Sequence, residues 1–303
     1  MSKRVVLLGQ PVTHSLSEAL QMAAFAAAGI DAQYQPIDTP TVDLPEAVKA
    51  LRSEDYLGAN IGVPHKDRVV PLLDRLTEEA QSTGAVDTIT IDGEELVGHN
   101  TDVIAFKPAL EELVGNAKMP KNAVVVGAGG GGRAAIYSLI QAGFQNVALF
   151  NRHLHRGERL VKHFGRSASH MDLKARPWHE SVIEAELAKT DILINASAMG
   201  RDPEETPIPG ELLPPDILVM DLHYVPEETR LLKEAKEAGA AKAMNGDVML
   251  IEQTVAAFEL WTGEKAPRDV IKKTLKSARN EPDVPVPPAE EKANGEQAAE
   301  TGA

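Results

Sequence analysis

Residues 123–132 of this 303-residue chain are AVVVGAGGGG, and this stretch decides the fold. Four apolar residues typical of a buried strand lead into Gly127, Gly129 and Gly132, which match the pattern G-x-G-x-x-G, and a helical pattern follows over residues 134–142. Glycine at these places permits a tight turn, lets backbone N–H groups approach a pyrophosphate and allows close helix-on-strand packing. Because both flanking elements are present, the stretch predicts a dinucleotide-binding loop that includes Gly130 and Gly131, rather than a flexible linker.

The chain on either side of this loop predicts two α/β units. After the loop, the patterns indicate a doubly wound nucleotide fold, with strands at 147–150, 191–195 and 217–221 and a helix at 156–164. Before it, strand and helix patterns also alternate, which predicts a mostly parallel sheet, with helices at 15–28, 41–51 and 69–83 and strands at 5–9, 32–37, 57–62 and 85–91. Two more helical patterns, at 248–260 and 267–278, are compatible with packing against either unit.

Composition limits the classes of protein to consider. The chain has 43% hydrophobic residues, enough to fill such cores, and no cysteine, which excludes disulfides, thiolate catalysis and cysteine-ligated metals. A formal charge of −14 disfavours binding to nucleic acid or anionic lipid. The apolar run of residues 5–8 is too short for a signal peptide or a membrane span. We therefore expect a cytoplasmic protein that acts on a small molecule, without a metal site.

The residues after the strand at 147–150 indicate which dinucleotide is bound. An NAD site usually places Asp or Glu there, to accept a hydrogen bond from the ribose 2′-hydroxyl. This chain has Asn151, followed by Arg152 and Arg156. A neutral side chain with two guanidinium groups favours a 2′-phosphate, because arginine offers a planar, permanently charged fork to phosphate oxygens. The sequence thus favours NADP over NAD, although either arginine could be an ordinary surface charge.

Four further clusters resemble motifs of the shikimate dehydrogenase family, and they occur in the same order. They are His14-Ser15-Leu16-Ser17, Asn60-Ile61-Gly62-Val63-Pro64-His65-Lys66, Gly98-His99-Asn100-Thr101-Asp102 and Met249-Leu250-Ile251-Glu252-Gln253. The resemblance covers about residues 5–275. It implies an N-terminal substrate-binding unit of residues 1–103, joined by C-terminal helices over 248–279, and a Rossmann-type NADP unit of residues 104–247, with the cleft between them.

The same resemblance implies roles for individual residues. Lys66 and Asp102 match the catalytic pair, whereas without the family a surface lysine and a helix N-cap would be the simpler interpretations. The substrate would be bound by the side chains of Ser15, Ser17, Tyr224 and Gln253, together with positions Gly62 and Asp87. Backbone near the nicotinamide would come from Ala196, Leu222 and Val248.

The chemistry explains why such a pair is needed. Oxidation of a secondary alcohol removes a proton from oxygen while a hydride leaves the same carbon, so a group must accept that proton. Lys66 would accept it, and Asp102 would hydrogen-bond both the lysine and a substrate hydroxyl. Burial favours the neutral amine and a nearby carboxylate favours the ammonium, so the two groups titrate as a coupled pair.

Several positions depart from the family's patterns. The threonine of Asn-Val-Thr-x-Pro-x-Lys is Gly62, which removes a hydroxyl, and the asparagine of Ala-Val-Asn-Thr is Asp87, which would add a carboxylate beside Lys66. On the cofactor side the departures are Val103, Ala198 and Val248.

Three functions remain open on these grounds. The first is reversible NADP-dependent oxidation of shikimate, as in aromatic amino-acid and chorismate biosynthesis. The second is a related dehydrogenase for quinate, or for an aminoshikimate whose ammonium pairs with Asp87. The third is a nucleotide or metabolite sensor, which the presence of both Lys66 and Asp102 argues against. We expect a monomer or homodimer, and a disordered acidic tail over residues 281–303.

Overall fold

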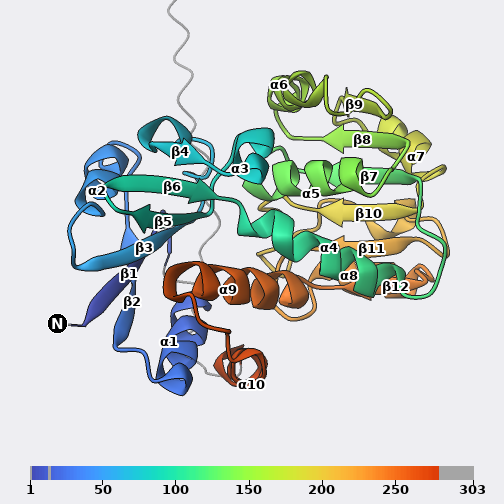
Figure 1. Cartoon of the computed structure of the whole chain (residues 1–303). Coiled ribbons are helices and arrows are strands. Elements are labelled where there is room, and N and C mark those ends of the chain that lie inside the picture. The colour runs from blue at the N-terminus through green and yellow to red at the C-terminus, as the bar shows by residue number, and fades with distance from the viewer. Residues whose placement is uncertain (1, 13–14, 280–303) are drawn as a thin grey trace, which may run out of the picture.

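The computed structural model describes residues 2–12 and 15–279, and it contains two six-stranded sheets flanked by helices (Figure 1). The predicted tail of residues 281–303 lies outside the described residues, as does His14. Both sheets are mostly parallel, which confirms the predicted α/β class with a Rossmann-type half. Among the residues described, no helix has both the length and the apolar character needed to cross a membrane.

The second sheet has strand order β12-β11-β10-β7-β8-β9, and all of its strands are parallel. Its strands are β7 (Asn122–Val126), β8 (Asn146–Phe150), β9 (Asp172–Arg176), β10 (Ile192–Asn195), β11 (Leu218–Asp221) and β12 (Lys242–Met244). Its helices are α5 (Gly130–Gln141), α6 (Leu154–Phe164), α7 (Glu180–Leu187) and α8 (Arg230–Glu237). The strand order reverses between β7 and β10, the place where nucleotide folds of this type bind their ligand.

The apolar run before the glycines forms the centre of this sheet. Val124 and Val126 face one buried cluster, while Ala123 and Val125 face the other, as the two-residue period of a strand requires. Both faces are covered, so the strand is apolar throughout rather than alternating.

The first sheet has order β2-β1-β3-β5-β6-β4. Its strands are β1 (Lys3–Gly9), β2 (Ala32–Asp38), β3 (Tyr56–Ile61), β4 (Arg75–Leu76), β5 (Thr88–Asp92) and β6 (Glu95–His99), and its helices are α1 (Ser17–Ala28), α2 (Leu44–Ala50) and α3 (Glu78–Thr83). Strand β5 runs antiparallel to both β3 and β6, and a two-residue turn closes a β5/β6 hairpin that our alternation pattern did not predict.

The prediction of one helix over residues 69–83 is wrong. The segment contains a short 3-10 helix at Val70–Leu72, the strand β4 and then α3, which starts at Glu78. Pro71 lacks the N–H that a continuous helix would need. The Asp74 carboxylate then accepts from the Leu96 backbone N–H at 2.7 Å, which fastens the chain beside β6 instead of in a helix.

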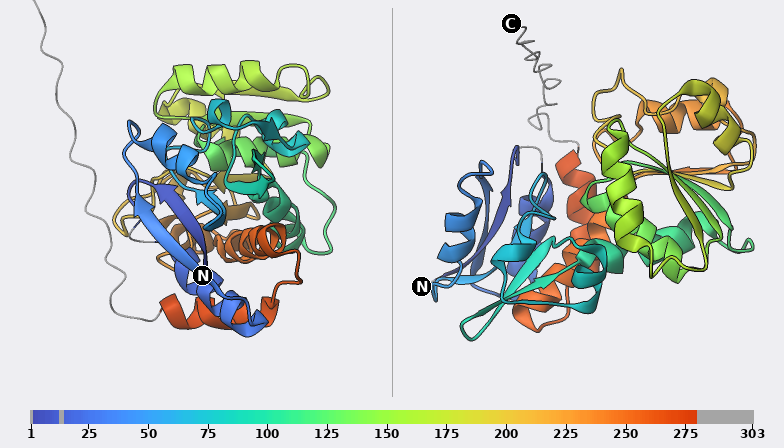
Figure 2. Two further views of the ribbon diagram at one scale, coloured as in Figure 1. Left: turned by 60° about the vertical axis from the view of Figure 1, so that its left-hand side comes forward. Right: turned by 90° about the horizontal axis from the view of Figure 1, so that it is seen from above.

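The C-terminal helices return to the first sheet. Helix α9 (Asp247–Thr262) packs against α4 (Thr101–Val114), β3 and β5, and α10 (Arg268–Arg279) packs against α1. Phe258 and Trp261 of α9 are buried with Phe25 of α1 in the core of this unit. Figure 2 shows the orange-red helix α9 between the N-terminal half and the nucleotide-type half, whereas α10 lies beside α1. Helices α4 and α9 thus connect the two sheets. They also hold the strand ends near which the candidate site lies.

Candidate active site

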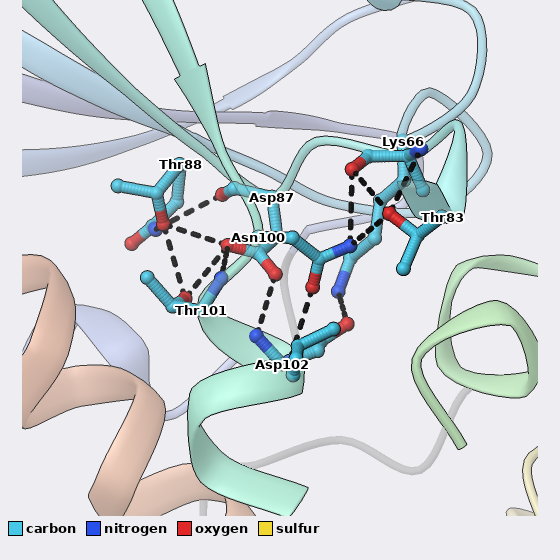
Figure 3. Close-up of polar contacts among 10 residues, drawn as sticks. Lys66, Thr83, Asp87, Thr88, Asn100, Thr101 and Asp102 are labelled. Atoms are coloured by element: carbon cyan, nitrogen blue, oxygen red, sulfur yellow. Dashed lines mark hydrogen bonds and ion pairs between the residues drawn. The ribbon is translucent and has the colours of Figure 1, made fainter. Parts of the chain in front are cut away.

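Lys66 and Asp102 form an ion pair in which Lys66 Nζ donates to Asp102 Oδ2 (Figure 3). Lys66 lies in the turn after β3, and its backbone carbonyl accepts from the Val86 N–H at 2.7 Å. Asp102 lies in the first turn of α4. Their side chains are 17% and 7% exposed, so the pair is largely shielded from water yet still reachable. The structure therefore brings together the two residues that the motifs predicted as partners.

Asp87 lies directly before β5 and points at the start of α4. Its Oδ1 accepts from the Thr101 N–H at 2.8 Å, from the Thr101 hydroxyl at 2.7 Å and from the Thr88 hydroxyl at 2.8 Å. Its Oδ2 accepts from the Asp102 N–H at 2.8 Å. All four donors belong to the protein, and one of them is the backbone of the candidate catalytic aspartate.

Asn100 caps the same helix from the other side. Its Oδ1 accepts from the Val103 N–H at 3.1 Å, and its amide donates to the Ala85 carbonyl and the Thr83 hydroxyl, each at 3.0 Å. The first three N–H groups of α4, which have no partner within the helix, therefore all have side-chain acceptors. The N-terminus of α4 is held firmly, and so is Asp102.

The cluster has two carboxylates for one ammonium. Burial disfavours the charged amine, but the nearby Asp102 and Asp87 carboxylates outweigh it and raise the pKa of Lys66 above its ordinary value. Burial also raises the pKa of Asp102; the Lys66 charge opposes this rise and Asp87 adds to it. Both pKa values rise because the cluster buries two carboxylates with one amine, and both rises favour a proton bound within the cluster.

Hydroxyl groups lie near this cluster. The Tyr224 phenol lies beside the Ser15 side chain, and it is close enough to Arg201 and to Lys66 for both charges to act on it. Burial raises the pKa of Tyr224, which remains neutral and able to donate a hydrogen bond. Ser15 Oγ also accepts from the Ser17 N–H at 3.2 Å at the start of α1. Together these groups present hydroxyl donors near two cations, Lys66 and Arg201, an arrangement suited to a carboxylate.

Two residues of this region were not predicted as site residues. Tyr34 hydrogen-bonds Ser17, and its hydroxyl donates to Asn60 Oδ1 at 2.8 Å. Asn60 in turn donates to the Thr88 hydroxyl at 3.0 Å. The alternating burial of β2 puts Tyr34 on the inward face, which was the available signal. Its partners lie far away in sequence, so periodicity alone could not identify them.

The glycine loop lies where a pyrophosphate would be bound. Gly127 has a φ of 107°, and a Cβ on Gly132 would lie 2.0 Å from the Gly127 carbonyl oxygen, so the tight turn excludes side chains. Nothing lies within 4 Å of a Cβ built on Gly129, at the N-cap of α5. The open cradle and the N-terminus of a 12-residue helix fit an anionic phosphate group.

The loop also touches Lys66, the candidate catalytic lysine. A Cβ on Gly130 would lie 2.5 Å from Lys66 Cδ and 3.1 Å from Lys66 Cβ. Gly131 is near Leu222 and Ala196, since its Cβ would lie 3.3 Å from Leu222 Cδ1 and 3.7 Å from Ala196 Cβ. The predicted cofactor residues Gly130, Gly131, Ala196 and Leu222 thus gather next to Lys66.

The remaining predicted residues lie around this centre. Asn151 Oδ1 accepts from the Ala128 N–H of the glycine loop at 3.1 Å, and Arg152 and Arg156 are exposed beyond it, near the start of α6. Val248 lies in the first turn of α9, where it packs with the core that α4 and α5 share, and Gln253 lies half-buried further along the same helix. Gly62 follows β3, and its N–H donates to the Leu8 carbonyl at 2.8 Å.

Comparisons with known proteins agree with this geometry. The profile described as shikimate dehydrogenase substrate binding domain matches residues 7–89, that of shikimate / quinate 5-dehydrogenase matches 110–202, and that of the shikimate 5'-dehydrogenase C-terminal domain matches 248–276. A shikimate dehydrogenase (NADP(+)) from Desulforamulus reducens is 38% identical over 272 residues, which cover 89% of this chain and 93% of that protein.

Two solved structures are similar over nearly their whole length. The shikimate 5-dehydrogenase of Thermus thermophilus, in complex with NADP(H) and shikimate, is 36% identical with a TM-score of 0.79, and the match covers 91% of this chain and 99% of that one. The quinate dehydrogenase of Corynebacterium glutamicum, in complex with NAD, is 33% identical with a TM-score of 0.80 and the same coverage. On this basis the chain belongs to the shikimate dehydrogenase family.

Proposed function

We propose that this protein catalyses the reversible NADP-dependent oxidation of shikimate to 3-dehydroshikimate. The observation that carries the proposal is the contact between the residue pair that would handle the proton and the loop that would bind the dinucleotide. The Lys66–Asp102 pair, which can take a proton, lies directly against Gly130 of the dinucleotide loop. Proton and hydride can therefore leave one carbinol group toward neighbouring sites. The relatives named as NADP-dependent shikimate dehydrogenases support the same assignment.

The side chains would divide the binding of substrate between its two ends. Ser15, Ser17 and Tyr224 would donate hydrogen bonds to the carboxylate, close to the positive charge of Lys66. Asp102 and Gln253 would contact ring hydroxyls. Two such anchor points fix the orientation of the ring, which places the reacting hydroxyl at Lys66.

Lys66 would act as the base in the oxidative direction. Its neutral amine accepts the hydroxyl proton while the C–H bond breaks, and the carbinol becomes a ketone. Bound NADP would supply the ring that accepts the hydride and its two electrons. Asp102 orients the amine through its hydrogen bond and stabilises the ammonium that forms. In the reductive direction, the same ammonium returns the proton to the oxygen.

NADP would be held by the chain's own backbone and by two arginines. The α5 N-terminus and the open cradle at Gly129 suit the pyrophosphate, and Asn151 fixes the loop by its bond to Ala128. Arg152 and Arg156 would bind the 2′-phosphate, where an acidic residue would otherwise repel it. NADP is therefore preferred to NAD.

Quinate is the second candidate substrate. The family includes a quinate dehydrogenase with the same fold, and Gly62 removes a hydroxyl that shikimate enzymes usually offer. Since that hydroxyl contacts the ring substituents, its loss leaves room for a different ring.

We further infer how the protein is organised. The proposed division is a substrate unit of residues 1–103 with 248–279, and a nucleotide unit of residues 104–247, supported by the two sheets and by the packing of α9 on the first. We propose a cytoplasmic enzyme, since a chain without cysteine needs no oxidising compartment. A monomer or a homodimer is compatible with this arrangement.

One assay tests the assignment. The absorbance of the reduced nicotinamide, NADPH or NADH, is followed with shikimate, quinate and an aminoshikimate, each with NADP and with NAD. Shikimate with NADP should give the highest kcat/KM. Tight NADP binding without turnover of any substrate would remove the enzymatic assignment, and preferred turnover of quinate would replace the substrate.

A further inference from the structure

We infer that Asp87 is a positioning residue, which holds Asp102 and the start of α4 in place and does not bind substrate. The inference rests on the catalytic roles proposed for Lys66 and Asp102. Its basis is the set of four hydrogen bonds that the Asp87 carboxylate accepts from Thr88, Thr101 and Asp102.

The carboxylate has little capacity left for a ligand. Two carboxylate oxygens offer about four acceptor sites; three of the internal donors already crowd Oδ1, and the Asp102 N–H takes one site of Oδ2, which leaves one Oδ2 site. Asp87 is also only 2% exposed. Because so little of Asp87 is exposed, a substrate hydroxyl or ammonium has little access to the remaining Oδ2 site, and at Oδ1 it would have to displace a donor that would then be buried without a partner.

The geometry links both catalytic residues to this one carboxylate. Oδ2 of Asp87 accepts from the Asp102 backbone N–H, so it fixes the point from which the Asp102 side chain extends. One residue earlier, the Val86 N–H donates to the Lys66 carbonyl at 2.7 Å. The segment 86–87 therefore sets the distance between the two groups that share the proton. A negative side chain at this place is also favoured by the partial positive charge of the α4 N-terminus.

The same charge acts on the titration of the pair. The groups that face Lys66 are Asp102, Asp87 and Tyr224, and those that face Asp102 are Lys66 and Asp87. Asp87 is therefore the one charged group that acts on both Lys66 and Asp102 without itself taking part in the proton transfer. Removing it lowers the pKa of Lys66 and lets the amine lose its proton at a lower pH.

Asp87→Asn tests the inference, since asparagine keeps the shape but has one acceptor oxygen and no charge. At the pH optimum of each enzyme, we expect kcat for shikimate to fall by about tenfold to a hundredfold, because small displacements of reacting groups are costly. KM should stay within about twofold. The acidic limb of the kcat profile should move to lower pH by about one unit, on the order expected for one partly buried charge.

Thr101→Val is the matched control. It removes one hydrogen bond to Asp87 Oδ1 but leaves the charge in place. We expect kcat to fall several-fold with the pH limb unmoved, and this variant also serves if Asp87→Asn does not fold. A raised KM with intact kcat in Asp87→Asn would make Asp87 a substrate ligand and overturn the inference. An unchanged kcat and pH limb would overturn it as well.

A second readout does not depend on turnover. The rate at which a small amine-reactive reagent acylates Lys66 is measured against pH by mass spectrometry, without substrate. The midpoint should move to lower pH in Asp87→Asn and stay in place in Thr101→Val. If the wild-type chain oxidises no substrate but this shift occurs, the proposed function fails and the electrostatic role of Asp87 stands; an unmoved midpoint refutes that role directly.

Discussion

Replacing Gly130 by alanine should slow the reaction without unfolding the protein. Gly130 is the first residue of α5, and its φ lies outside the left-handed region, so the backbone accepts an alanine. The added Cβ, however, would lie 2.5 Å from Lys66 Cδ and 3.2 Å from Lys66 Cγ. Carbon atoms that do not share a bond prefer about 3.5–4 Å. The lysine stem must therefore move by about 1 Å.

The magnitude follows from that displacement. A misplacement of about 1 Å is able to cost about a hundredfold in rate, which corresponds to roughly 2.7 kcal/mol on the barrier. The effect on stability should be small, because alanine gains about 0.5–1 kcal/mol over glycine in a helix and crowding offsets this. The variant should thus fold normally and have a kcat about a hundredfold lower.

The assay compares two glycines of one loop. For Gly130→Ala and Gly129→Ala, kcat and the KM values for shikimate and NADP are measured from NADPH absorbance, and thermal unfolding is measured alongside. A Cβ on Gly129 meets nothing within 4 Å, so Gly129→Ala should raise the KM for NADP and leave Lys66 in place. If Gly130→Ala keeps kcat within about twofold, Lys66 does not lie against the loop in the working enzyme.

Three more variants test the substrate site, the core and the cofactor site. In Gly62→Thr, the nearest neighbours of the new Cβ lie 3.6 Å away, so the backbone position accepts a side chain. The added hydroxyl should lower the KM for shikimate by about fivefold, as one hydrogen bond of about 1 kcal/mol allows; an unchanged KM would mean that the substrate offers no partner there. Trp261→Phe removes the 3.0 Å hydrogen bond from Trp261 Nε1 to the Ile89 carbonyl and should lower the free energy of unfolding in urea by about 1–3 kcal/mol. A loss under about 0.5 kcal/mol would contradict the importance of that bond. Replacing Arg152 and Arg156 by alanine should reduce the NADP-to-NAD ratio of kcat/KM at least about tenfold, and an unaltered ratio would place the 2′-phosphate elsewhere.

The elements closest to local sequence rules were predictable. The glycine loop follows from the steric needs of one turn, and β7 ends where the pattern placed it, but α5 begins at Gly130, four residues before the predicted start at 134. Lys66 and Asp102 were paired through motif order rather than through periodicity. The structure adds the reason for their closeness, since the start of α4 is capped by Asn100 and Asp87 together.

Other features depend on contacts that local patterns do not contain. Residues 69–83 have helical composition, but Pro71 and the bond of Asp74 to Leu96 divide the segment. The antiparallel β5 depends on one short turn. The expectation that Asp87 contacts substrate came from the family, whereas its four internal donors come from parts of the chain that only the fold brings together.

The direct test of the central claim is shikimate oxidation by Lys66→Met, in which an apolar side chain of similar length replaces the base. Wild type should form NADPH from shikimate and NADP, at a rate that rises with pH because the pKa of Lys66 is raised and the amine must lose its proton. The variant should bind NADP as wild type does, and its kcat should fall by about a hundredfold to ten-thousandfold, the contribution of a general base. A kcat within a few-fold of wild type would contradict the assignment of Lys66 as the proton acceptor.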